Sequence, residues 1–366
     1  MTRVLMTADT VGGVWTYACE LAQALAPHGV EITLAAMGGV LSVAQARRAA
    51  AIPSLDVFES SYALEWMAEP WRDVDAAGDW LLGLAARVRP DRVHVNGYAH
   101  AALPFEAPVV VVAHSCVWTW TRAVRGRDPG PEWGEYRRRV VAGLTAADLV
   151  IAPTQAILGA VLDAYAVRLR TRVIPNACAT EAWRPGKKAR IVLSAGRLWD
   201  EAKGLADLQA CARRVQWPIV IAGPSVAPGG RAPVPADGLY PLGELAPREL
   251  AAWMARAAIY ALPARYEPFG LSVVEAALSG CALVLGDIPS LREVWGETAV
   301  YVPPGDPEAL GFALNVMRRD SLGRGLYATR ARARALTMAP ARMATAYRAA
   351  YAELATSRPA RSAARP

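Results

Sequence analysis

The sequence feature that most constrains the fold is a regular alternation of short apolar runs with longer amphipathic runs. Residues 4–8 are apolar, residues 14–25 carry apolar side chains at helical spacing, and residues 30–36 are apolar again. Short apolar runs of this kind are typical of buried strands, and helices between them require a parallel sheet that is covered on both faces. The alternation therefore predicts an α/β chain built on doubly wound sheets.

The alternation occurs twice, and an aperiodic stretch separates the two series. Residues 176–188 contain Pro, Gly and two Lys without apolar periodicity, which is typical of a linker between domains. A chain of 366 residues is also too long for one ordinary core. We therefore expect two Rossmann-like domains facing each other across a cleft, over residues 1–175 and 176–337. Ligands of such sheets bind at the carboxyl ends of the strands.

Each half has its own predicted elements, and a further helix follows the second half. Residues 338–354 are expected to form a helix that packs back on the first domain, and the Ala/Arg/Pro-rich residues 355–366 are expected to be disordered. In the first half the further predicted strands are residues 92–96, 108–113, 149–152 and 172–175, and the further helices are 74–88, 99–103, 132–146 and 155–165. In the second half the predicted strands are residues 191–195, 219–222, 259–262, 282–285 and 300–302, and the helices are 205–215, 247–257, 271–278 and 307–318.

The charge and cysteine content indicate an intracellular protein with anionic partners. The net charge of +7 favours nucleotides, acidic glycans or an anionic membrane surface. The five cysteines are scattered, form no Cys-x-x-Cys pair and are odd in number, which favours free thiols in a reducing compartment. No apolar window is long enough to span a membrane. We expect a cytoplasmic protein that could contact the inner membrane face.

Two glutamates flank a predicted helix N-terminus in the second half. Glu267 lies in a bent loop after the strand 259–262, and Glu275 lies just over one turn inside the helix 271–278. The amides and positive end of such a helix suit an anionic or polar ligand. Acids are common at helix N-termini, which would explain Glu267 without any ligand. That alternative does not account for Glu275 on an otherwise apolar helix.

Two cations follow the first strand of the second half. Arg197 and Lys203 lie on the loop at the carboxyl end of the strand 191–195. Together they could hold a diphosphate and stabilise the negative charge that develops when it leaves. The alternative is a solvated pair beside Asp200 and Glu201. The paired glutamates at another strand end of the same sheet favour the functional interpretation.

These motifs resemble a known family. Gly196-Arg197-Leu198…Lys203-Gly204, followed by Glu267-Pro-Phe-Gly-Leu-Ser-Val-Val-Glu275, is similar to the donor half of retaining glycosyltransferases of the family 4 type, which have the GT-B fold of two Rossmann-like domains. Two further segments support the resemblance, Val-Ile-Pro-Asn-Ala at 173–177 and Tyr-Val-Pro-Pro-Gly-Asp-Pro at 301–307. The chain departs from the family pattern in the four residues that separate Leu198 from Lys203, where three are usual.

The resemblance implies a hexosyltransferase that moves a sugar from a nucleotide-sugar donor to a hydroxyl acceptor with retention of anomeric configuration. The acceptor would be a glycan, a lipid or a small molecule, and no cofactor or metal is implied. Arg197 and Lys203 would hold the donor diphosphate, and Glu267 would accept hydrogen bonds from the donor sugar. The remaining donor contacts implied are the backbone amides of Phe269, Gly270 and Leu271, and the carboxylate of Glu275 on the ribose hydroxyls.

The first half contributes a glycine pair and a histidine. Gly12 and Gly13 follow the first strand, where glycines let the backbone approach a ligand closely, although the spacing is not that of a dinucleotide fingerprint. In the resembled family the corresponding loop lines the cleft. His114 ends the apolar run 109–113, and the family often has a histidine at this point, near the reacting sugar. A structural histidine is the alternative. We interpret His28, His94 and His100 as structural or surface residues.

Two other motifs are interpreted as structural. Asp73-Val-Asp75 matches an Asp-x-Asp metal motif, but it lies at a predicted helix start where acids are favoured, and no other acid or histidine cluster has metal spacing. The arginines between residues 122 and 139 accompany several tryptophans and could hold a lipid phosphate or a glycan. A solvated face over core aromatics is the interpretation we favour there. Nucleic-acid binding is not expected, because no recognition fold is apparent.

Three other functions are compatible with the same residues. A nucleotide-sugar epimerase would release free epimerised sugar without an acceptor, and a glycosyl phosphorylase would require phosphate. A non-catalytic sugar-nucleotide sensor or scaffold would bind the donor without transfer or slow hydrolysis. The intact pairs Arg197/Lys203 and Glu267/Glu275 favour an active enzyme.

Overall fold

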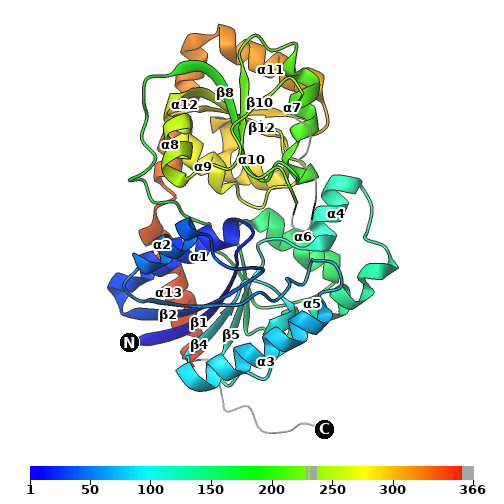
Figure 1. The fold of residues 1–366 in the computed structure, drawn as a ribbon, viewed down its shortest axis with the longest axis vertical. Helices are drawn as coiled ribbons and strands as arrows, with labels where there is room; N and C mark the ends of the chain where they lie inside the picture. Colours follow the sequence, from blue (N-terminus) through cyan, green and yellow to red (C-terminus); the bar gives the residue numbers. More distant parts are fainter. Residues whose placement is uncertain (228–229, 231–236, 357–366) are drawn as a thin grey trace.

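The computed structural model, which describes residues 1–227, 230 and 237–356, contains two parallel β-sheets that lie one above the other in Figure 1. The N-terminal sheet has seven strands in the order β3-β2-β1-β4-β5-β6-β7, and the C-terminal sheet has six in the order β10-β9-β8-β11-β12-β13. Helices cover both sheets. This arrangement confirms the expected pair of doubly wound halves.

The N-terminal half follows the predicted alternation. Its strands are β1 (Thr2–Asp9), β2 (Val30–Met37), β3 (Leu55–Glu59), β4 (Arg92–Val95), β5 (Val109–Val112), β6 (Leu149–Ala152) and β7 (Thr171–Val173). Its helices are α1 (Gly13–Leu25), α2 (Val43–Ala50), α3 (Trp71–Val88), α4 (Val117–Arg125), α5 (Gly134–Ala146) and α6 (Gln155–Tyr165). The strand order reverses between β1 and β4. In doubly wound sheets, ligands bind beside such a reversal, at the carboxyl ends of the strands.

The C-terminal half repeats the plan with its reversal between β8 and β11. Its strands are β8 (Ala189–Ala195), β9 (Ile219–Ala222), β10 (Tyr240–Pro241), β11 (Ala257–Leu262), β12 (Ala282–Gly286) and β13 (Val300–Val302). Its helices are α7 (Leu205–Ala212), α8 (Pro247–Arg256), α9 (Leu271–Leu278), α10 (Pro289–Trp295), α11 (Pro307–Arg319) and α12 (Ser321–Leu336). The loops after β8 and β11 carry Arg197, Lys203 and Glu267, and they therefore meet at the reversal.

The last helix, α13 (Pro340–Thr356), returns from the C-terminal half to the N-terminal half and lies beside α1 (Figure 1). Tyr347 and Tyr351 are fully buried there. The Tyr17 hydroxyl donates to the Tyr347 hydroxyl at 2.5 Å, and Arg92 Nε donates to the Tyr351 carbonyl at 2.9 Å. The helix thus ties the two halves together at the side of the N-terminal sheet.

The structure differs from the sequence-based expectation in several elements. The elements that the sequence did not predict are helices α2, α4, α10 and α12 and strands β3 and β10. The expected helix at residues 99–103 is a short 3-10 turn, Ala99–Ala102. It ends there because Leu103, the residue before Pro104, adopts an extended conformation. The expectation for the tail falls mostly on residues 357–366, which lie outside the described residues.

Candidate active site

The loop after β8 brings Arg197 into the space between the two halves. Arg197 Nη2 donates to Asp200 Oδ2 at 2.9 Å, and the guanidinium lies over the Trp199 ring at 5.3 Å. Gly204 ends the loop with φ of +73°, and a Cβ at that position would overlap the Pro263 carbonyl oxygen. Only glycine allows this loop to lie so close to the end of β11, and the loop geometry that positions Arg197 depends on it.

Lys203 and Glu267 form a partly buried ion pair at the reversal of the C-terminal sheet. Lys203 Nζ lies 2.7 Å from Glu267 Oε2, with side-chain exposures of 15% and 13%. Ser290 donates from its hydroxyl to the Glu267 carbonyl at 2.6 Å, which fixes the loop before α9. The four-residue spacer before Lys203 therefore still delivers the ammonium group to the paired-glutamate loop.

Helix α9 begins at the bend that the sequence predicted. Gly270 occupies its N-cap with φ of +88°, a left-handed conformation that favours glycine, and the Phe269 side chain is buried. The amides of Gly270 and Leu271 lie at the N-terminus of an eight-residue helix, where the helix dipole favours negative charge.

Glu275 lies one turn inside α9 and faces the N-terminal half. Burial raises the pKa of its carboxyl to about 8, and the Glu20 carboxylate adds to the shift while the Arg48 guanidinium opposes it. Arg48 and Glu20 form an ion pair between α2 and α1. A carboxyl with this raised pKa is mostly protonated at neutral pH.

The turn between β1 and α1 lies against Arg197. Asp9 Oδ1 accepts hydrogen bonds from the backbone N–H groups of Val11 and Gly12 at 3.1 Å and 3.0 Å. A Cβ built on Gly12 would lie 3.0 Å from Arg197 Nη1, and one built on Gly13 would lie 3.8 Å from Leu271 Cδ1. Burial raises the pKa of the Asp9 carboxyl although Arg197 opposes the shift. The glycine pair thus faces the C-terminal residues directly.

His114 follows β5 and is held by Asn96 at the end of β4. Asn96 Nδ2 donates to the Thr7 carbonyl at 2.7 Å, so Asn96 Oδ1 is the atom that accepts from His114 Nε2 at 2.9 Å. The same oxygen accepts from His94 Nε2 at 3.2 Å, and Tyr351 donates from its hydroxyl to His94 Nδ1 at 2.7 Å. Both histidines therefore carry their proton on Nε2.

Both imidazoles in this network are neutral. Burial lowers the pKa of His94 and of His114 to about 3, and for His114 the neighbouring His94 adds to the effect. His94 is fully buried, whereas His114 is partly exposed and lies edge-on to the Tyr17 ring at 4.5 Å. His94 is thus a structural residue of the core and not a surface residue, and His114 borders the reversal point of the N-terminal sheet.

The two halves make further direct contacts around these residues. Thr119 Oγ1 lies 2.8 Å from the Tyr266 hydroxyl, and Thr154 Oγ1 donates to the Pro268 carbonyl at 3.2 Å. The Glu293 carboxylate accepts the N–H groups of the first two residues of α6 at 2.7 Å and 2.8 Å. A carboxylate of one half thereby satisfies a helix N-terminus of the other, which stabilises this arrangement of the halves.

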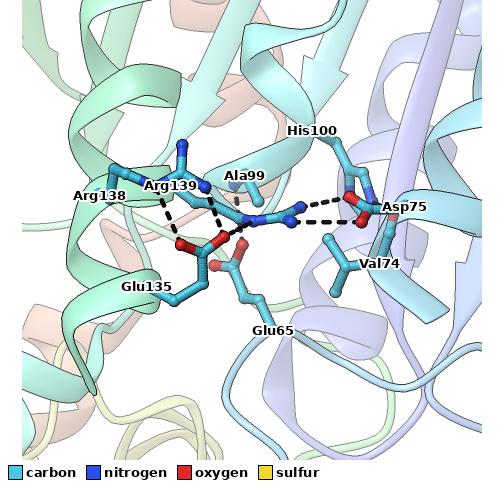
Figure 2. A network of polar contacts seen from close by, with 8 residues as sticks. All are labelled: Glu65, Val74, Asp75, Ala99, His100, Glu135, Arg138 and Arg139. Carbon is cyan, nitrogen blue, oxygen red and sulfur yellow. Dashed lines mark hydrogen bonds and ion pairs between the residues drawn. The ribbon is translucent and has the colours of Figure 1, made fainter. Parts of the chain in front are cut away.

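The arginine cluster of the first half is largely neutralised by acids, as Figure 2 shows for its C-terminal part. Arg139 pairs with Asp75 and with Glu135, and Glu135 also pairs with Arg138. Arg122 pairs with Asp128 and Asp163. These contacts support the interpretation of the cluster as a solvated face, and they explain Asp75 without a metal.

Figure 2 also shows two groups that stabilise the short turn after β4. Glu65 accepts from the Ala99 amide at 2.8 Å, and His100 Nε2 donates to the Val74 carbonyl at 2.9 Å.

All five cysteines are free and buried. Within the described residues there is no group of three or more metal-ligating side chains. No helix in the same residues combines the length and the apolar character needed to span a bilayer.

Three residues of the site were not identified from the sequence. Asp9 orders the glycine turn, Asn96 holds His114, and Asp200 holds Arg197. Asp9 and Asn96 lie at the carboxyl ends of β1 and β4, and Asp200 lies in the loop that follows β8. All three positions are next to a sheet reversal, and that is a signal that could have identified them.

Two family models match the chain. The model described as Glycosyltransferase Family 4 matches residues 11–182, and the model described as Glycosyl transferases group 1 matches residues 189–320. Among curated proteins, the glycogen synthase of Mycobacterium tuberculosis strain H37Rv is 28% identical over 275 residues, which are 65% of this chain. The chain spans 63% of the length of that relative.

Solved structures of similar fold cover nearly the whole chain. Sucrose-phosphate synthase from Thermosynechococcus elongatus superposes with a TM-score of 0.81 at 18% identity, covering 98% of this chain and all of that one. Anabaena HepE in complex with UDP-glucose superposes with a TM-score of 0.75 at 17% identity, covering 96% of this chain and all of that one. These likenesses show the GT-B fold. The two matched domains and this fold place the chain in the family 4 type of glycosyltransferases.

Proposed function

We propose that the chain transfers a hexosyl unit from a nucleotide-sugar donor to a hydroxyl acceptor with retention of anomeric configuration. The observation that carries the proposal is the convergence of Arg197, Lys203 and Glu267 at the reversal of the C-terminal sheet, opposite the Gly12 turn. Two cations beside an acceptor of sugar hydroxyls suit a ligand that combines a diphosphate with a sugar.

Each side chain has a distinct role in this proposal. The donor diphosphate replaces Glu267 as the ion-pair partner of Lys203. It also lies against Arg197 and the N-terminus of α9. Glu267, once released from Lys203, accepts hydrogen bonds from the sugar. Glu275 receives the ribose hydroxyls, and His114 borders the sugar from the other half.

The catalytic contribution is mainly electrostatic. Negative charge grows on the diphosphate as the glycosidic bond breaks, and Arg197 and Lys203 stabilise that charge in a site from which closure of the halves excludes water. The leaving phosphate itself helps to deprotonate the acceptor, which is compatible with retention. We expect turnover without an added metal, and full activity after EDTA treatment would agree with this expectation.

The acceptor and the cellular setting are also proposals. The relative in M. tuberculosis is named a glycogen synthase, and the structural relative in T. elongatus is named a sucrose-phosphate synthase, so oligosaccharides and sugar phosphates are the first acceptors to test. The excess of positive charge supports contact with an anionic membrane face, and the five free cysteines support a cytoplasmic location. Flotation with liposomes of anionic and of neutral lipid would test that contact.

A panel of UDP-, GDP- and ADP-sugars tests the function, beginning with UDP-glucose because HepE was solved with it. Thermal shift reports binding, and hydrolysis of the donor without acceptor reports chemistry. Replacement of Arg197 by Ala should lower turnover about a hundredfold or more. Epimerised free sugar would instead indicate an epimerase, and binding without hydrolysis or transfer would indicate a non-catalytic protein.

A further inference from the structure

Asp200 is a buried carboxylate in the part of the loop that departs from the family pattern. It is one of the four residues between Leu198 and Lys203, and only 5% of it is exposed. Its Oδ1 accepts from the Ala202 N–H at 3.0 Å, which forms the N-cap of the turn that leads to Lys203. A buried carboxylate is stable only when its oxygens are hydrogen-bonded, so its partners here are energetically important.

The two oxygens of Asp200 have partners in different halves. Oδ2 accepts from Arg197 Nη2 at 2.9 Å, within the same loop. Oδ1 also accepts from Trp120 Nε1 at 3.1 Å, and Trp120 belongs to α4 of the N-terminal half. One carboxylate therefore contacts the arginine of the proposed donor site and the opposite half at the same time.

The bonds of Asp200 to Arg197 and to Trp120 depend differently on the distance between the two halves. The bond to Arg197 lies within one loop and persists when the halves separate, whereas the bond from Trp120 exists only when they are close. Loss of the indole donor leaves Asp200 with a lone pair that competes for the neighbouring guanidinium. The orientation of Arg197 in the cleft thus responds to the distance between the halves.

We propose that Asp200 is a positioning residue that couples closure of the two halves to the orientation of Arg197, with Trp120 as the group that registers closure. The inference rests on the proposed function, because it takes Arg197 as the residue that holds the donor diphosphate. It adds a residue that does not touch the donor itself and acts through Arg197.

A second contact between the same segments supplies a matched control. Arg125 of α4 pairs with Glu201 at 3.2 Å, next to Asp200 in sequence, and the two side chains are 48% and 62% exposed. An exposed ion pair contributes little. Arg125 also lies over the Trp120 ring at 5.4 Å, so the control substitution is made at Glu201 and leaves Arg125 in place. Glu201→Gln therefore removes the charge of one contact between the halves and leaves the Trp120–Asp200–Arg197 contacts in place.

A double-mutant cycle tests the coupling. Trp120→Phe keeps an aromatic ring but removes the N–H donor together with part of the indole ring system, and Asp200→Asn keeps an oxygen acceptor but removes the charge beside Arg197. Each is measured alone and together with Arg197→Ala. Two quantities are measured, donor turnover and the affinity for whichever of UDP, GDP and ADP stabilises the wild-type protein most.

With Arg197 present, Trp120→Phe should lower donor turnover about tenfold, the effect of one charge-assisted hydrogen bond. With Arg197→Ala, the same substitution should change turnover and nucleotide affinity by less than about twofold, because it acts through the missing guanidinium. Asp200→Asn should show the same dependence on Arg197, so the test stands if either variant fails to fold. Glu201→Gln should change turnover less than about twofold in either background.

The outcomes separate this inference from the proposed function. Equal losses with and without Arg197 in an active enzyme, or an equal loss for Glu201→Gln, would overturn the coupling alone. A wild-type protein that neither binds nor hydrolyses any nucleotide-sugar would overturn the proposed function and this inference with it.

Discussion

Substitution of Gly12 by Ala probes how closely the two halves must approach. The Gly12 backbone has φ of −148° and ψ of −155°, an extended conformation that alanine adopts without strain, and its N–H bond to Asp9 is retained. The new Cβ would lie 3.0 Å from Arg197 Nη1. Because a comfortable contact needs about 3.5 Å, the guanidinium has to withdraw by about 0.5 Å.

This displacement sets the expected magnitude. A misplacement of about 1 Å in a reacting group can cost about a hundredfold in rate, so a shift of half that size should lower turnover about tenfold. The thermal unfolding midpoint should stay near that of the wild type, because the clash involves only the flexible end of a side chain. The assay compares kcat and KM for the donor with the unfolding midpoint.

Gly13→Ala is the matched comparison. Its Cβ would meet only Leu271 Cδ1, at an ordinary contact distance of 3.8 Å, so Arg197 is not displaced and the loss of turnover should be smaller. Wild-type turnover in Gly12→Ala would refute the placement of Arg197 against the turn. A large fall in its unfolding midpoint would show that the glycine is required by the backbone instead.

Three further predictions concern titration and packing. Because the native Glu275 carboxyl keeps its proton up to a pKa of about 8, whereas an unfolded one loses it near 4.5, stability should fall as pH rises between these values. The free energy of unfolding of Glu275→Gln, measured by chemical denaturation relative to that of the wild type, should therefore be higher at pH 8 than at pH 5. The same variant should bind nucleotide more weakly. The pKa values of His94 and His114, lowered to about 3, predict neutral Nε2–H imidazoles from pH 5 to 8 in nitrogen NMR of histidine-labelled protein; protonated rings at pH 6 would contradict the network. Gly143→Ala would place a Cβ into the Tyr98 carbonyl oxygen, so it should cost about 1–3 kcal/mol in the free energy of unfolding without changing nucleotide affinity.

Local sequence signals predicted those parts of the fold whose ends are set by nearby residues. Helix α9 has the predicted bounds because Gly270 adopts a left-handed conformation before it and Gly280, also left-handed, follows it. Helix α12 was missed for the opposite reason. Its sequence contains two glycines and alternates Ala with Arg, and it is stabilised by packing against α9 and β12, which no local pattern reveals.

The same distinction applies within the site. Arg197, Lys203 and Glu267 lie at strand ends of one sheet, so their convergence followed from topology and motif spacing alone. The pairing of Lys203 with Glu267 did not follow, because it depends on the path of the loop between them. Asp200 was interpreted only as a solvating neighbour, since its contact with Trp120 joins positions 80 residues apart.

The histidines show most clearly why residue type and position are insufficient. His94 and His114 both lie near carboxyl ends of strands in the first half. The sequence separated them by the loop that follows His114 and by the resemblance to the family. In the structure both rings donate to the same oxygen, Asn96 Oδ1. They differ in the surroundings of the rest of the ring. His94 is closed off by Tyr351, from a helix 257 positions away, whereas His114 keeps a partly exposed edge. The return of α13 to the first half therefore decides which imidazole is available to a ligand.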